Sequence, residues 1–162
     1  MGEVPQGNKD NMTRQDKFGA EDVFDLTRRQ LLNAYTCTEC GRCTDECPAN
    51  KTGKRLSPRK IMMDIRDRME ELISKGDEVK ENTLLYNYIS PEEIWACTTC
   101  AACIEACPID INPMRIIMDM RQFLVMEKSE MTLAITMMMN AVENNGAPWV
   151  YNKEDRLNWA NG

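Results

Sequence analysis

The run Cys37-Thr-Glu-Cys-Gly-Arg-Cys-Thr-Asp-Glu-Cys-Pro48 has the spacing C-x₂-C-x₂-C-x₃-C-P, and the run Cys97-Thr-Thr-Cys-Ala-Ala-Cys-Ile-Glu-Ala-Cys-Pro108 repeats it. These two runs contain all eight cysteines of the chain. The spacing is typical of bacterial-type iron–sulfur ligation, in which three cysteines bind one 4Fe–4S cube and the fourth binds the other. The sequence therefore predicts two 4Fe–4S clusters.

The predicted order of the ligands follows from the shape of a cube. Each of four iron corners needs one thiolate, and two residues between ligands let a short turn reach three corners in succession. The proline after the fourth cysteine has a fixed φ and no amide hydrogen, so it ends the turn and redirects the chain. The fourth corner is then reached from the other run. The predicted sets are Cys37, Cys40, Cys43 and Cys107 for cluster 1, and Cys97, Cys100, Cys103 and Cys47 for cluster 2.

The repeat extends beyond the cysteines into the segments that follow them. Ser57-Pro-Arg-Lys-Ile-Met-Met-Asp-Ile-Arg66 and Asn112-Pro-Met-Arg-Ile-Ile-Met-Asp-Met-Arg121 match in register, and each begins with a helix-capping residue followed by proline. No strand pair is expected. We predict an all-α fold with two pseudo-symmetric units, each made of a helix, a cluster turn and a helix. Further helix starts are expected at Thr27, Ser90 and Thr132.

The chain divides by composition into three parts. Residues 1–20 are polar and contain glycine and proline, so they are expected to be a disordered N-terminal linker. Residues 21–130 contain both cysteine runs and are expected to form a di-cluster domain. Residues 131–162 are expected to supply a C-terminal helix and an exit segment.

Side chains between the ligands are expected to shield and tune the clusters. Thr38 and Ala49 are assigned to cluster 1. Residues 98–99 are both threonine and are expected to donate hydrogen bonds to sulfur, which would raise a reduction potential. The apolar side chains assigned to cluster 2 are Ile104, Ile109 and Ile111.

The composition limits both the metal chemistry and the partner. The chain has no histidine, which excludes Rieske-type ligation and zinc sites of mixed cysteine and histidine. The formal net charge is −6, and two oxidised cubes with eight thiolates would make the protein more negative. An acidic surface argues against nucleic acid and fits docking to a basic redox partner.

Other uses of eight cysteines remain open at this point. They could form four disulfides in a secreted protein, or two zinc–thiolate sites in a structural scaffold for a partner subunit. Residues 1–20 lack the apolar segment of a signal peptide, and two identical blocks of close ligands suit cubes better than cross-links. An enzyme that uses a cluster as catalyst would need an open iron corner, whereas eight cysteines saturate eight corners. We expect no catalytic residue and no transmembrane segment.

The chain resembles the α-helical ferredoxin domain. The segment between Cys47 and Cys97 has a helical pattern, unlike the shorter gap of small bacterial ferredoxins. The likeness is to heterodisulfide reductase-like oxidoreductases, including the iron–sulfur subunit of anaerobic glycerol-3-phosphate dehydrogenase. It covers about residues 17–160. Besides the cysteines, it is carried by the segments Leu56-Ser-Pro-Arg59, Cys107-Pro-Ile-Asp-Ile111 and Glu143-Asn-Asn-Gly-Ala-Pro-Trp149.

The resemblance implies an electron-transfer protein or subunit that relays single electrons within an oxidoreductase complex. It implies a flavoprotein as donor, and a CCG-type cluster domain or a quinone-linked module as acceptor. Because the sequence contains no CCG motif, it implies either a piece of a longer protein or a stand-alone carrier protein. The implied location is the cytoplasm, including the cytoplasmic face of the membrane, with peripheral membrane association through a partner.

Overall fold

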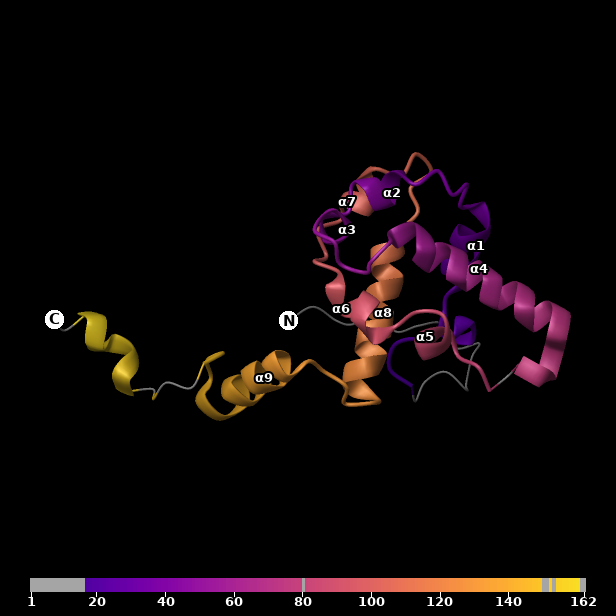
Figure 1. Ribbon diagram of the computed structural model, residues 1–162. Helices are drawn as coiled ribbons and strands as arrows, with labels where there is room; N and C mark the ends of the chain where they lie inside the picture. The colour runs from indigo at the N-terminus through magenta and orange to yellow at the C-terminus, as the bar shows by residue number, and fades with distance from the viewer. Residues whose placement is uncertain (1–16, 80, 150–151, 153, 161–162) are drawn as a thin grey trace. The chain divides into compact units, whose positions relative to one another are not determined.

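The computed structural model describes residues 17–79, 81–149, 152 and 154–160 (Figure 1). Most of the predicted linker, residues 1–16, lies outside the described residues. The described part is built from helices and contains no strand, which confirms the all-α prediction. The elements are η1 (Val23–Asp25), α1 (Arg28–Thr36), α2 (Arg42–Asp45), α3 (Pro48–Lys51), α4 (Pro58–Lys75), η2 (Gly76–Val79), α5 (Leu84–Asn87), α6 (Pro91–Ala96), α7 (Ala102–Glu105), α8 (Pro113–Met126), α9 (Leu133–Asn145) and η3 (Glu154–Ala160).

Side-chain caps fix the starts of the helices that flank the cysteine runs. Thr27 caps α1 in a capping box with Gln30, and Ser90 caps α6 in the same way. Ser57 Oγ accepts the N–H of the third residue of α4 at 3.3 Å, and Asn112 Oδ1 accepts the corresponding N–H of α8 at 2.9 Å. Each cap satisfies a backbone N–H that has no partner inside its helix. The predicted helix starts at these four positions are confirmed.

The chain divides into two compact units, with the division between Glu127 and Lys128. In the first unit, α1 packs on α4 and α6 packs on α8, so each cysteine run lies between a short helix and a long one. The long helices α4 and α8 contact each other, as do α2 and α7 (Figure 1). The second unit contains α9 and η3. The predicted boundaries of the di-cluster domain and of the exit segment stay a prediction.

The core of the first unit lies between the two long helices. Burial of their apolar stripes supplies the main stabilisation, at about 25 cal/mol for each Å² of apolar surface removed from water. Leu84, Leu85 and Ile89 close the core from the segment that joins the halves. The buried apolar side chains of α4 and α8, apart from the prolines that begin each helix, are Ile61, Met62, Ile65, Ile116, Ile117, Met120, Phe123 and Leu124.

A buried ionic contact attaches the segment before α1 to this core. Arg68 of α4 is fully buried, and its Nε and Nη2 lie 3.2 and 3.1 Å from the carboxylate oxygens of Asp22. The same carboxylate accepts the N–H of Leu84 at 3.1 Å. Because a buried charge is tolerated only when it is paired and hydrogen-bonded, this contact holds three distant segments in one arrangement.

The last residues of the predicted linker pack closely against α8. Ala20 is buried, and its N–H donates to the carbonyl oxygen of Asp119 at 3.0 Å. Gly19 has a φ of +76°, and a Cβ added there would lie 2.2 Å from Asp119 O and 2.4 Å from Phe123 N. The backbone of α8 therefore leaves no room for a side chain at position 19.

Replacing Gly19 with alanine should destabilise the first unit more than replacing Gly53. Gly53 has a similar φ of +80°, but a Cβ there meets no atom within 4 Å. Gly53→Ala carries only the left-handed backbone penalty of about 1 kcal/mol. Gly19→Ala adds a steric clash with the helix backbone, and we expect a loss of about 3 kcal/mol. Thermal unfolding of both variants measures the difference, and equal losses would contradict the close contact.

Candidate iron–sulfur centres

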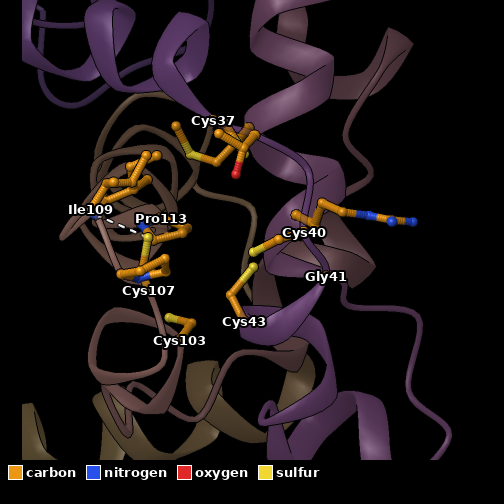
Figure 2. A pocket seen from close by; sticks show the side chains of 13 residues that line it. Cys37, Cys40, Gly41, Cys43, Cys103, Cys107, Ile109 and Pro113 are labelled. Carbon is orange, nitrogen blue, oxygen red and sulfur yellow. Dashed lines mark hydrogen bonds between the residues drawn. The ribbon is translucent and has the colours of Figure 1, made fainter.

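Four cysteines gather around a cavity in the first unit, and a fifth, Cys103, also lines it (Figure 2). Cys37, Cys40 and Cys43 come from the first run, and Cys107 comes from the end of the second run. Figure 2 shows Cys40, Cys43 and Cys107 around the same space, with Cys103 beside it. The remaining lining residues are Thr38, Gly41, Arg59, Met62, Pro108, Ile109, Ile111 and Pro113.

A second cavity gathers the other four cysteines. Cys97, Cys100 and Cys103 come from the second run, and Cys47 comes from the end of the first. The two cavities enclose about 400 and 310 Å³ of space not filled by protein atoms, including their open mouths. Each cavity thus contains the first three cysteines of one run and the last cysteine of the other, and Cys103 lines both cavities. The remaining lining residues are Leu56, Pro58, Thr98, Ala101, Met114 and Ile117.

The backbone of the two cysteine runs has the same unusual conformation. Glu39 and Gly41 have φ angles of 57° and 85°, and the equivalent Thr99 and Ala101 have 55° and 63°. Left-handed residues that alternate with ordinary ones turn successive N–H groups toward one point, and such a concavity attracts anions. Gly41 adopts this conformation without strain, whereas Ala101 adopts it despite its Cβ. The repeat of the sequence is therefore also a repeat of the backbone.

The charges that act on two thiols, the half-buried Cys43 and the buried Cys103, include those of every other cysteine in the same predicted set. Burial raises the pKa of Cys43, and the nearby charges of Cys37, Cys107 and Cys40 raise it further. Burial likewise raises the pKa of Cys103 to about 11, together with Cys97, Cys43, Cys47 and Cys100. Such thiols stay protonated near neutral pH unless a cation stabilises their thiolates. Metal binding supplies that positive charge and releases the protons.

Hydrogen bonds to sulfur are present in both cavities. The N–H of Thr99 donates to Cys97 Sγ at 3.4 Å, and the N–H of Ile111 donates to Cys107 Sγ at 3.4 Å. The N–H of Ala102 and the hydroxyl of Thr98 lower the pKa of Cys100. Two of these donors, the N–H of Thr99 and the hydroxyl of Thr98, belong to the expected residues, whereas the N–H groups of Ile111 and Ala102 were not predicted. Donors of this kind stabilise negative charge on a thiolate or on a cluster.

The donor set fits two cubes. All eight cysteines are free thiols. Their sulfurs are spread around the two cavities, and among the described residues no three Cys, Asp or Glu side chains converge on one position for a single metal ion. Soft thiolates in sets of four, with an apolar surround and N–H donors, are the ligands that a 4Fe–4S cube takes.

The side chains that surround each cavity differ in part from the expectation. Ile109 and Ile111, which were assigned to cluster 2, line the cavity of Cys37, because the chain carries them across with Cys107. Ala49 is buried but lines neither cavity, whereas Thr38 lines the first as expected. The first turns of α4 and α8 also line the cavities, which was not predicted. The repeat could have indicated them, because the equivalent pairs Pro58 and Pro113, Arg59 and Met114, and Met62 and Ile117 all line a cavity.

Comparison with known proteins agrees with this geometry. Residues 36–111 match the family described as the 4Fe-4S dicluster domain. This segment contains both cysteine runs and both cavities' sulfurs. The chain therefore contains a segment that matches the 4Fe–4S dicluster domain. The cofactors of the dicluster domain are two 4Fe–4S clusters.

The dicluster domain is similar to parts of larger iron–sulfur proteins. The chain is 32% identical to the probable iron-sulfur-binding oxidoreductase FadF of Bacillus subtilis, over 90% of this chain and 25% of the relative. It is 32% identical to the EtfAB:quinone oxidoreductase of Syntrophomonas wolfei, over 92% of this chain and 24% of the relative. It is also 30% identical to one subunit of a CoB-CoM heterodisulfide reductase of Methanosarcina acetivorans, over 67% of this chain and 56% of the relative.

These relatives confirm the resemblance to heterodisulfide reductase-like iron–sulfur proteins. The chain spans about a quarter of the length of the first two. Among its described residues, none of the helices is both long enough and apolar enough to cross a lipid bilayer.

Exchange of single cysteines tests the predicted ligand sets. Cys47→Ser should remove or alter the same cluster as Cys97→Ser, because both sulfurs line one cavity. Cys107→Ser should instead match Cys37→Ser. Electron paramagnetic resonance of the four reduced variants distinguishes the two clusters without prior assignment of either signal. Agreement between Cys47→Ser and Cys37→Ser would contradict crossed ligation.

Proposed function

We propose that this chain relays single electrons through two 4Fe–4S clusters within an oxidoreductase complex. The observation that carries the proposal is the pairing of two four-sulfur cavities. Cys103, a member of the second set, also lines the cavity of the first, so the two cavities are neighbours. Two cofactors at neighbouring positions suit transfer of an electron from one to the other.

The residues of this chain hold and tune the cofactors. Eight thiolates would saturate all eight iron corners, which leaves no corner for a substrate. Apolar side chains such as Met62 and Ile117 exclude water from the cavity walls, and N–H groups stabilise charge on sulfur. Reduction of such a cluster adds one electron. Substrate chemistry is thus assigned to another domain or subunit.

The proposed partners follow from the relatives and from charge. The name EtfAB:quinone oxidoreductase states a quinone as one reactant of that relative. We propose a flavoprotein as donor to this chain and a CCG-type cluster domain or a quinone-linked module as acceptor. The net charge of −6 favours a basic docking surface on the partner. We place the complex in the cytoplasm, in peripheral contact with the membrane where the acceptor is quinone-linked.

Metal and sulfide analysis tests the proposal. Protein purified without oxygen should contain about eight iron and eight acid-labile sulfide per chain, because two cubes each contain four of both. It should take up about two electrons in two one-electron steps during reductive titration. About two zinc ions without sulfide would instead support a structural scaffold. A colourless sample free of iron would reject electron relay.

A further inference from the structure

The two long helices place an arginine at the same position of the repeat, but the two side chains differ in their contacts. Arg66 of α4 corresponds to Arg121 of α8. Arg66 forms an ion pair with Glu39, which lies between the first two cysteines of its own run. The neighbouring carboxylate raises the pKa of Arg66. In the first half of the molecule, the charge of this arginine is thus neutralised.

Arg121 instead lies against the start of the second cysteine run. Its Nε and Nη2 donate to the carbonyl oxygen of Ile94 at 3.0 and 2.8 Å, and Nη2 also donates to the carbonyl oxygen of Cys97. The guanidinium carbon lies 5.1 Å from the centroid of the Trp95 ring. The side chain is partly buried.

The sequence explains why Arg121 lacks the carboxylate that Arg66 has. The position equivalent to Glu39 is Thr99. Among the described residues, no carboxylate forms an ion pair with Arg121. Its interactions are with neutral carbonyl groups and an aromatic face, and one of those carbonyl groups belongs to the cluster ligand Cys97. A partly buried cation beside a cysteine ligand needs a negative counterpart, and a thiolate-ligated cluster supplies one.

We propose that Arg121 raises the reduction potential of the cluster in the cavity of Cys97 and makes it the higher of the two potentials. The inference rests on the proposed function. One-electron reduction of a cluster adds one negative charge, and the electron comes from the external reductant. Arg121 stabilises that added charge through a medium of low polarity. When the protein has taken up one electron, that electron then resides on this cluster.

Two other arginines lie near the opposite cavity and act more weakly. Arg59 lines the cavity of Cys37, where Met114 is its equivalent, and Arg42 occupies the position of Ala102. Both arginine side chains are exposed. Water and salt screen exposed charges, whereas a partly buried charge is screened less. The ion pair of Arg66 with Glu39 has no net charge and adds little to the potential of the cluster in the cavity of Cys37. The sum of these charges therefore gives the higher potential to the cluster beside Arg121.

Potentiometric titration of the protein with both clusters tests the role of Arg121. In Arg121→Gln, the higher of the two potentials should fall, so that the ratio of reduced to oxidised cluster at a fixed solution potential decreases about tenfold, or about 59 mV for one electron. Arg121→Lys retains the charge and should keep most of the wild-type potential. If the higher potential falls as far in Arg121→Lys as in Arg121→Gln, the proposal is overturned. A shift of the lower potential alone would also overturn it.

An exchange at the equivalent positions 39 and 99 gives a second test that does not replace Arg121 itself. Thr99→Glu places a carboxylate where Glu39 stands in the other half, and it should lower the same potential as Arg121→Gln. Glu39→Thr should leave that potential in place and raise the other, because it removes the partner of Arg66. No shift in either variant, at normal iron content, would reject the inference and leave electron relay standing. Absence of iron from the wild-type protein would reject the proposed function itself.

Discussion

The last cysteine of each run lies in the cavity that is lined by the first three cysteines of the other run. Cys47 joins Cys97, Cys100 and Cys103, and Cys107 joins the first three cysteines of the chain. Neither half of the molecule can therefore complete a four-sulfur site by itself. Binding of either cluster would hold the two halves together, and the contacts of α2 with α7 and of α4 with α8 are arranged around that requirement.

The pseudo-symmetry has a functional consequence because it is incomplete. The backbone turns, the helix caps and the apolar stripes are nearly the same in both halves. Charges differ: Glu39 neutralises Arg66, whereas Thr99 leaves Arg121 against the carbonyl groups that lead into Cys97. Two equal halves would hold the electron equally. A difference of charge at equivalent positions makes one of the two clusters the preferred site for the electron.

Local features of this fold could be predicted from the sequence, and long-range features could not. Thr27 and Ser57 act on N–H groups within one turn, so their capping role is visible in a few residues. Arg68 belongs to a residue type that is mostly exposed, and its burial depends on Asp22, which lies far away in the chain. Gly19 belongs to a polar segment that was expected to be disordered, and only the position of α8 shows why it is glycine.

The sequence predicts which cysteines form each candidate site, but not all of the other side chains that line the two cavities. The ligand sets follow from the spacing and the shape of a cube, and they stay a prediction that the cavities support. Ile109 and Ile111 were assigned by their nearness to Cys103 in sequence, although they follow Cys107 and so lie with the opposite set.

The most direct measurement is an iron anomalous-scattering map from a crystal grown without oxygen. It should show two four-iron peaks, one bonded to both Cys47 and Cys97 and the other to both Cys37 and Cys107. Single-ion peaks, or clusters bonded to four cysteines of one run, would contradict this account.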